Sequence, residues 1–177
     1  HLSLSVGSYL VVMVVCALVA FGGVPLVLFV VGRRLPREHT ATRSVHLGAS
    51  RERVFDFLVD VRASPRWRSD VTQVQIVGQE PRLRYRERGR FGLVLFEVEE
   101  VIRPERFVTS VVPERGDMAF SGRWLWSLAE DDGGTRVTLT EEGSVRSPIF
   151  RALVHYLFGT TSTIDRTLAA LARHLRT

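Results

Sequence analysis

The sequence contains no lysine: its 24 basic side chains are all arginine, against 19 acidic side chains and a formal net charge of +5. Such a bias follows from genome composition often enough that it does not by itself indicate a nucleic-acid partner. Cysteine is nearly absent too, with Cys16 the one example in 177 residues. A single cysteine excludes an intramolecular disulfide framework and a multi-cysteine metal site within this sequence.

Familiar catalytic and cofactor motifs are also missing. The five histidines are dispersed, and no spacing of His, Cys, Asp and Glu is typical of a zinc or di-iron site. There is no GxSxG elbow, no P-loop and no dinucleotide-binding fingerprint. We therefore expect no metal and no cofactor. We also expect no nucleic-acid partner, because no nucleic-acid-binding motif is recognisable.

One long apolar segment is present near the N-terminus. Residues 9–31, YLVVMVVCALVAFGGVPLVLFVV, carry no charge. As a helix they would extend about 35 Å, enough for a hydrocarbon core of about 30 Å. The segment is longer than the apolar region of a secretory signal, and no A-x-A cleavage pattern follows it. The sequence therefore predicts a single transmembrane helix, kinked near Gly22, Gly23 and Pro25.

The flanks of this segment predict its orientation. Arg33, Arg34 and Arg37 follow it, whereas residues 1–8 contain no Lys or Arg. By the positive-inside rule the C-terminal part is expected in the cytoplasm, with these three arginines at the membrane surface. The predicted organisation has four parts: an N-terminal flank 1–8, a transmembrane helix 9–31, a basic juxtamembrane linker 32–40 and a folded domain 41–177.

The folded domain has a clear order of predicted elements. A strand is expected over 41–49, a helix over 51–60 capped by Ser50, and a short helical turn over 63–67. A final helix begins at Ser147-Pro148 and keeps near-helical apolar spacing almost to the C-terminus. Between them lie six strand-like runs, at 71–78, 82–90, 93–102, 106–113, 117–128 and 134–143. This order predicts an α+β fold in which the final helix covers an antiparallel sheet of about seven strands.

Three stretches resemble a known superfamily. They are VFDFLVDVRASPRWRSDV at 54–71, SGRWLWSL at 121–128 and GGTRVTLT at 133–140. Together with the order of elements, they resemble the START-like or SRPBCC superfamily, most closely its polyketide cyclase/dehydrase and lipid-transport branch. The resemblance implies a helix-grip fold, in which a curved antiparallel sheet wraps a long C-terminal helix and leaves a cavity between them.

Arginine occupies every second position of PRLRYRERGR, residues 81–90. The period of a strand puts these arginines on one face: Arg82, Arg84, Arg86, Arg88 and Arg90. A turn at Phe91-Gly92 predicts Arg84 opposite Glu99 and Arg86 opposite Glu97, which favours a solvated outer face. Contact with anionic lipid headgroups is the alternative. Nucleic acid comes third, because the neighbouring glutamates weaken a phosphate-binding stripe.

The opposite face is expected to line the cavity, although ordinary core packing is the alternative for each of its aromatic residues. Glu87 and Glu141 alternate onto this apolar side, where a carboxylate is paired, partly hydrated or shifted in pKa, unless it reaches water at a strand end. His155 borders the apolar stripe of the final helix, either in the cavity or at the surface. The predicted ligand-binding residues are Tyr85, Glu87, Phe96, Val98, Phe120, Trp124, Trp126, Leu139, Glu141, Val154, His155 and Phe158.

These features lead to one main functional hypothesis and two alternatives. The main hypothesis is a membrane-anchored cytoplasmic domain that binds a hydrophobic small molecule, lipid-like or polyketide-like, in the cavity. The first alternative is a cyclase or dehydratase of the same superfamily, with Glu87, Glu141 or His155 as acid or base, which requires polar groups that converge on one substrate. The second is a non-catalytic protein-interaction module with a filled core, whose protein partner the sequence leaves unidentified.

Overall fold

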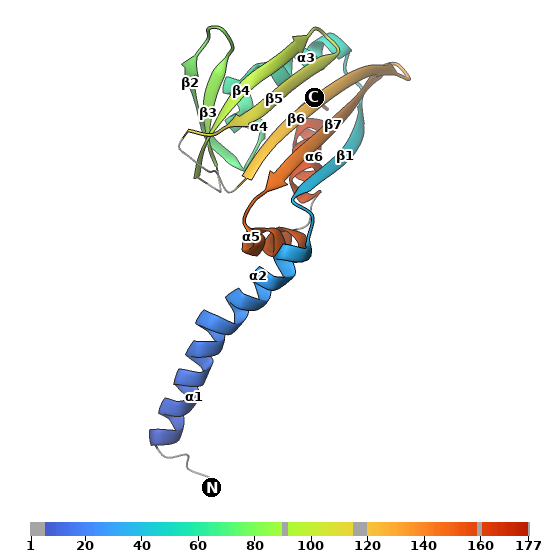
Figure 1. The fold of residues 1–177 in the computed structure, drawn as a ribbon. Coiled ribbons are helices and arrows are strands. Elements are labelled where there is room, and N and C mark those ends of the chain that lie inside the picture. Colours follow the sequence, from blue (N-terminus) through green and yellow to red (C-terminus); the bar gives the residue numbers. More distant parts are fainter. Residues whose placement is uncertain (1–5, 90–91, 115–119, 159–160, 177) are drawn as a thin grey trace.

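The computed structural model describes residues 6–89, 92–114, 120–158 and 161–176. An N-terminal helix projects from an α+β domain (Figure 1). The helical elements are α1 (Val6–Leu18), the π-helical turn η1 (Val19–Gly23), α2 (Val24–Arg34), α3 (Arg51–Val59), the 3₁₀ turn η2 (Val61–Ala63), α4 (Ser64–Trp67), α5 (Pro148–Leu153), the π-helical turn η3 (Val154–Phe158) and α6 (Ser162–His174). The strands are β1 (Glu38–Leu47), β2 (Val71–Gly78), β3 (Arg84–Gly89), β4 (Gly92–Ile102), β5 (Arg106–Val112), β6 (Phe120–Asp131) and β7 (Gly134–Val145).

The strands form a seven-stranded antiparallel sheet in the order β1-β7-β6-β5-β4-β3-β2. Every neighbouring pair except β1–β7 is consecutive in the chain, so the sheet is a meander whose first strand pairs with its last. The β6–β7 hairpin closes through Asp132 and Gly133, which have φ of 42° and 75°. Two successive residues with positive φ match the twist of a two-residue hairpin loop, and this explains the Asp-Gly sequence there.

The core lies between helices α3 and α6 and one face of the sheet, which we term the inner face. Helix α3 contributes Phe55 and helix α6 contributes Ile164 and Leu171, each with 0 or 1% of its surface exposed. The inner face contributes a matching apolar set, including Trp126, Leu128, Val137 and Leu139. Burial of each large apolar side chain stabilises the fold by about 1.5–3 kcal/mol, so these contacts fix α6 over the sheet.

Both predicted helix starts are confirmed by their caps. The Ser50 hydroxyl accepts a hydrogen bond from the Arg53 backbone N–H over 3.3 Å, and the Ser147 hydroxyl accepts one from the Phe150 N–H over 3.3 Å. Each cap satisfies a backbone donor that the first turn of a helix leaves without a partner. The predicted fold class, an antiparallel sheet with a C-terminal helix against its inner face, is confirmed.

The C-terminal helix differs from the prediction in one respect. The sequence pattern indicated one long helix from Ser147 with a bend at Gly159, whereas α5 with η3 ends at Phe158 and α6 begins at Ser162; Gly159 itself lies outside the described residues. Helix α6 packs against β1 and β7, whereas α5 packs against α2. The predicted linker 32–40 is also shorter than expected, since α2 continues to Arg34 and β1 begins at Glu38.

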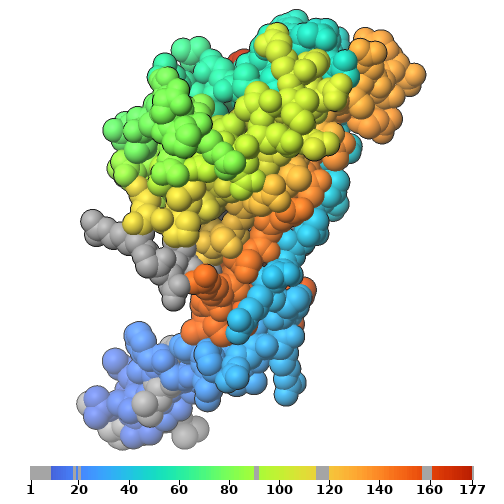
Figure 2. All heavy atoms as spheres, turned by 45° about the horizontal axis from the view of Figure 1, so that its top comes forward, coloured from blue at the N-terminus to red at the C-terminus, as the bar shows by residue number. Residues whose placement is uncertain are grey.

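The N-terminal helix is unlike any other part of the structure in its exposure. Among the described residues, Tyr9–Arg34 is the one helix that is long and apolar enough to cross a membrane, and no residue of its most apolar 18-residue stretch is buried inside the structure. The π-helical turn η1 lies within it, next to Pro25, where the sequence indicated a kink. In Figure 2 this helix projects from the body of the domain and meets it near α5.

The predicted register of the arginine-rich strand is corrected by two residues. Arg84 pairs with Glu97 and Arg86 with Leu95, because Gly89 pairs with Gly92. Gly92 has a φ of 98°, a conformation that favours glycine and suits the end of the turn. A shift of two residues leaves the side chains of β3 on their predicted face, so Arg84, Arg86 and Arg88 still point outward, whereas Arg90 lies outside the described residues.

Candidate functional site

Arg68 lies at the corner between α4 and β2 and extends its side chain over the inner face. The corner is fixed by Pro65 in the first turn of α4 and by a hydrogen bond from the Arg68 backbone N–H to the Ser64 carbonyl, 2.8 Å long. Nη1 of Arg68 donates to both carboxylate oxygens of Glu87 on β3, each over 3.2 Å, and Nη2 donates to Asp70 over 2.8 Å. The side chains of Arg68 and Glu87 are 11% and 8% exposed, so this ion pair is almost completely buried.

The charges of Arg68, Glu87 and Asp70, which we term the trio, do not cancel, because one guanidinium faces two carboxylates. Burial raises the pKa of Glu87 above its ordinary value, and Asp70 adds to the rise although Arg68 opposes it. Burial alone lowers the pKa of Arg68, but the attraction of Glu87 and Asp70 outweighs it and the pKa is raised. Of the two carboxylates around Arg68, Glu87 has the lesser access to water, which is why burial dominates its pKa.

Tyr85 is the neighbour of Glu87 on the same face of β3 and is 4% exposed. Burial raises the pKa of its hydroxyl far above the ordinary value, and the Glu87 carboxylate raises it further. The ring stacks on Phe96 of β4, with centroids 5.5 Å apart. Tyr85 is consequently a neutral phenol at all physiological pH values, with Thr109 as its hydrogen-bond partner.

Trp124 joins this trio to a second polar group. The guanidinium carbon of Arg68 lies 5.1 Å from the centroid of the Trp124 ring, within the range of a cation–π interaction. Indole Nε1 donates to Glu141 on β7 over 3.1 Å, and His39 Nε2 lies 3.4 Å from the other Glu141 oxygen. Gly143 leaves room for the imidazole, since a Cβ at that position would overlap the His39 ring.

These contacts form what we term the inner-face polar cluster, made up of His39, Arg68, Asp70, Glu87, Trp124 and Glu141. The side chains of His39 and Glu141 are 24% and 20% exposed, so this end of the cluster retains some contact with water. The cluster combines hydrogen-bond acceptors with aromatic and apolar walls, an arrangement suited to orienting a mostly apolar molecule by one polar group. Within the described ranges no His, Cys, Asp and Glu side chains are grouped as metal ligands.

The sequence profile of the family described as "Polyketide cyclase / dehydrase and lipid transport" matches residues 38–176. The chain belongs to this family. The match begins at the first residue of β1 and takes in the whole α+β domain, including every member of the inner-face polar cluster. Helices α1 and α2 lie outside it.

Solved structures share the fold of this family member at low sequence identity. A START superfamily protein from Mycobacterium smegmatis is 17% identical with a TM-score of 0.60, over 77% of this chain and 97% of its own. A protein from Thermus thermophilus is 24% identical with a TM-score of 0.61, over 78% and 96% of the two chains. The di-domain ARO/CYC protein BexL of the BE-7585A biosynthetic pathway is 16% identical with a TM-score of 0.61, over 83% and 53%. These likenesses establish the fold, and no curated protein matches the chain in sequence.

The structure brings together most of the predicted ligand-binding residues, but not all. Tyr85, Val98, Trp126 and Leu139 are buried in the core, and Phe96 and Trp124 pack partly buried against it. Glu87 and Glu141 belong to the polar cluster, and Phe120 is half-buried on β6 opposite Val145.

The three residues predicted from the final helix lie elsewhere. Val154 and His155 are in η3, continuous with α5, and His155 is exposed with its ring edge-on to Tyr156. The side chain of Phe158 lies outside the described part of the structure. Of the predicted membrane-surface residues, Arg33 and Arg34 are exposed in the last turn of α2, and Arg37 is exposed just before β1.

Sequence reasoning missed Arg68, Asp70 and His39. Arg68 and Asp70 follow the short helical turn and read as a polar loop, and His39 was assigned to the linker. One signal was available for Arg68: a carboxylate at position 87 on an apolar strand face needs a cation, and the loop that leads into the neighbouring strand carries one.

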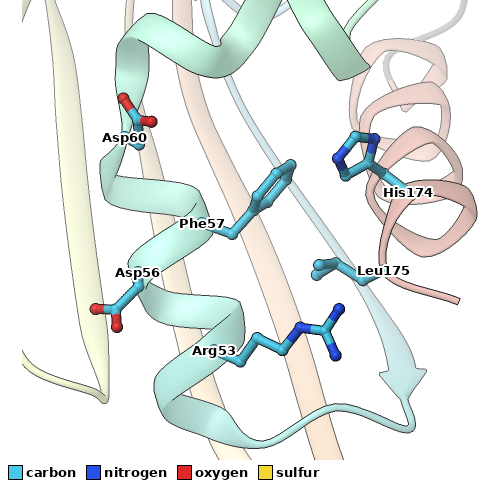
Figure 3. Close-up of a pocket in the computed structure, with 6 residues that line it drawn as sticks. All are labelled: Arg53, Asp56, Phe57, Asp60, His174 and Leu175. Carbon is cyan, nitrogen blue, oxygen red and sulfur yellow. The ribbon is translucent and has the colours of Figure 1, made fainter. Parts of the chain in front are cut away.

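A cavity lies between α3 and the C-terminal end of α6, and all its lining residues come from or directly follow these two helices (Figure 3). It has a volume of about 400 Å³ and is lined by Arg53, Asp56, Phe57, Asp60, His174 and Leu175. The Phe57 ring stacks on His174 with centroids 4.8 Å apart, and Asp56 forms an ion pair with Arg103. With three charged residues in its wall, this cavity does not suit a hydrophobic ligand.

Proposed function

We propose that this chain is a membrane-anchored, cytoplasmic family member that binds a hydrophobic small molecule against the inner face of its sheet. The observation that carries the proposal is the inner-face polar cluster: a buried Arg68–Glu87 pair with Trp124 and Glu141 beside it, on a face that is otherwise apolar. Stabilisation of the core does not explain such a cluster, because a buried ion pair contributes little net stability.

The ligand class follows from the walls and from the family. Phe96 and Trp124, which are only partly buried, offer flat apolar surface, and the Glu141 carboxylate retains access to a polar group that arrives from solvent. A lipid-like or polyketide-like molecule has this combination of an apolar body and a few oxygens. The family description, which couples polyketide cyclisation with lipid transport, supports the same class.

The membrane anchor is proposed from helix Tyr9–Arg34, whose most apolar stretch of 18 residues has no residue buried inside the structure. Arg33, Arg34 and Arg37 after the apolar segment favour a cytoplasmic domain. The anchor is tested by carbonate extraction of membranes from expressing cells. The full chain is expected to stay with the membrane, and deletion of residues 1–36 is expected to release the domain. A full chain that carbonate extracts would contradict the anchor.

Ligand binding is tested by photo-crosslinking of the full chain in lipid nanodiscs that contain a diazirine fatty acid. Because the chain has no lysine, trypsin cleaves only after arginine, and residues 124–136 form one peptide that carries two tryptophans of the inner face. We expect label on that peptide in addition to the N-terminal helix. Label confined to the N-terminal helix would contradict ligand binding and favour a protein-interaction module.

One observation favours a second candidate function, acid–base catalysis. Glu141 and His39 face each other at the more exposed end of the cluster, and burial raises the pKa of Glu87 at the other end. Groups of this kind move protons to and from a bound carbonyl compound, as cyclisation and dehydration require. Incubation with a panel of poly-β-ketones tests this candidate: a product that has lost water, absent with Glu141→Gln, would support catalysis, and an unchanged panel would leave binding as the function.

A further inference from the structure

Residues 148–156, which form α5 and the first part of η3, are apolar over almost their whole length. Their sequence, PIFRALVHY, contains one charged side chain, Arg151. Tyr156 is 64% exposed and His155 is exposed, while Ile149, Phe150, Leu153 and Val154 are only half-buried. This segment therefore presents apolar and aromatic surface to its surroundings, and the sheet does not account for it, since it is α6 that packs along the inner face.

The charge of Arg151 is used inside the protein. Its side chain is buried, and Nε donates to the Gly32 carbonyl over 2.9 Å while Nη1 donates to the Val145 carbonyl over 2.9 Å. Gly32 is in the last turn of α2, and its carbonyl, which also accepts from the Leu35 backbone N–H over 3.3 Å, lies at the negative end of the helix, where a cation is favoured. The outward surface of the segment is thereby left without a formal charge.

The same contact fixes the position of α5 relative to the N-terminal helix. Gly32 is buried against Pro148, and a Cβ at position 32 would overlap the Pro148 carbonyl. Figure 1 shows α5 beside the upper end of α2, at the end of the domain from which the helix projects. The start of α5 is thus level with the end of the apolar segment, next to Arg33 and Arg34.

We infer that residues 148–156 form a second membrane contact, an interfacial segment that lies in the headgroup region of the leaflet where the anchor ends. This inference rests on the proposed anchor. A residue that touches Gly32 must lie at the depth of the boundary between hydrocarbon and headgroups, and the segment is far too short to span the bilayer itself. An apolar helical segment at that depth lies in the plane of the interface, where exposed Tyr156 has both an apolar and a hydrated environment.

The interfacial segment and the anchor together hold the domain at a defined height above the bilayer. A single helix joined through a flexible linker would let the domain move freely. Here the buried Gly32–Pro148 contact and the Arg151 hydrogen bonds join the anchor to α5, and α5 continues from β7, the strand that carries Glu141. A ligand that leaves the bilayer beside α5 therefore starts close to the sheet.

The inference is tested with single-cysteine variants of the full chain in a Cys16→Ala background, labelled with an environment-sensitive fluorophore and reconstituted in phosphatidylcholine–phosphatidylglycerol vesicles. Labels are placed by Tyr156→Cys in the interfacial segment, Leu26→Cys in the anchor and Gln75→Cys on exposed β2. Doxyl-labelled lipids are expected to quench the first two labels to a similar extent and to leave the third unaffected. Aqueous iodide is expected to quench the third label most.

The outcomes separate this inference from the proposed anchor. If doxyl lipids quench the label at position 26 but the label at 156 responds only to iodide, the interfacial segment is overturned and the anchor stands. If neither label responds to doxyl lipids, the anchor fails and the interfacial contact fails with it.

A matched pair of glycine substitutions tests the link between the anchor and α5. Gly32→Val introduces a side chain against Pro148, whereas Gly22→Val in the same helix meets nothing within 4 Å. We expect Gly32→Val to move the label at position 156 from lipid-accessible to iodide-accessible while the label at 26 keeps its quenching, and Gly22→Val to change neither. Unchanged quenching at 156 in Gly32→Val would show that this contact does not hold the segment at the membrane.

Discussion

The two faces of the sheet carry the same chemical pair in opposite surroundings. On the outer face Arg84 donates to Glu97 over 2.6 Å, and on the inner face Arg68 donates to Glu87 over 3.2 Å. The hydrogen bond from Arg84 lowers the pKa of Glu97, with Arg82 adding to the effect. Burial raises the pKa of Glu87 despite its own arginine. The opposite directions teach that the environment, rather than the presence of an arginine, decides how a carboxylate of this protein titrates.

The difference between the two faces also distinguishes ion pairs with a structural role from an ion pair that is a candidate for a functional role. Outer-face pairs, such as Arg123 of β6 with Glu99 of β4 and Glu142 of β7, keep that face soluble and link strands across it. The inner-face pair has no such task, because the face around it is covered by helices. It is therefore the better candidate for a role in binding.

The largest expected difference in stability is between two variants that each remove the arginine from one face of the sheet. Arg68→Ala leaves Glu87 buried without its partner and is expected to lower the free energy of unfolding by about 3–5 kcal/mol near neutral pH. Arg84→Ala leaves Glu97 in water with Arg82, and we expect no measurable loss. Urea unfolding of the full chain in detergent, followed by tryptophan emission, provides the measurement. Equal losses for the two variants would contradict the distinction between the faces.

A smaller effect is expected at the other end of the inner-face polar cluster. Trp124→Phe keeps the aromatic packing but removes the indole N–H that reaches Glu141, and should cost about 1 kcal/mol. The control is Glu141→Gln, whose amide oxygen still accepts from the indole and whose cost should be lower. The same unfolding assay compares the two, and a larger loss for Glu141→Gln would contradict a hydrogen bond as the dominant contact.

The raised pKa of Glu87 predicts a dependence of stability on pH. A carboxyl group whose pKa is raised in the folded protein stabilises it below the ordinary value of 4.5, and this contribution is lost as the pH rises through the raised value. The free energy of unfolding should therefore fall with pH above 4.5 in the natural protein, and Glu87→Gln should remove that part of the slope. Parallel pH profiles for the two proteins would rule out this assignment.

The smallest effect is expected at Arg88, which is exposed on the outer face of β3. Arg88→Glu should change the free energy of unfolding by less than about 0.5 kcal/mol. Thermal unfolding of this variant should also be the same in vesicles of neutral and of acidic lipid. A loss of stability confined to acidic vesicles would instead support the alternative that the arginine-rich face contacts lipid headgroups.

What could be predicted from the sequence was whatever depends on local pattern. Ser50 and Ser147 indicate their helices because a capping hydroxyl acts within one turn, and strand alternation assigned Arg84 and Glu87 to opposite faces. The register could not be predicted in the same way. Apolar alternation distinguishes odd shifts from even ones, so it does not detect a slip of two residues, and Arg84 was assigned to the wrong glutamate.

The composition of the polar cluster depends on contacts that no local pattern reveals. His39 and Glu141 are 102 positions apart in the sequence, and Arg68 reaches Glu87 from a loop that precedes a neighbouring strand. The final helix was predicted as one helix bent at Gly159 because apolar spacing persists through η3, even though α5 packs on α2 and α6 on the sheet. The predictions that failed were those that depend on long-range pairing, which residue type does not reveal.

Trp124 has a cation over its ring and a carboxylate at its N–H. Light absorption moves electron density in an indole from the pyrrole ring toward the benzene ring, so these two charges set the energy of its emission through their electric field. The protein thus contains its own spectroscopic probe at the centre of the inner face. In a variant with Trp67 and Trp126 replaced by phenylalanine, Trp124 would be the source of the tryptophan fluorescence. A shift in its emission wavelength would then report a change of charge at Glu87 or Glu141 without any added label.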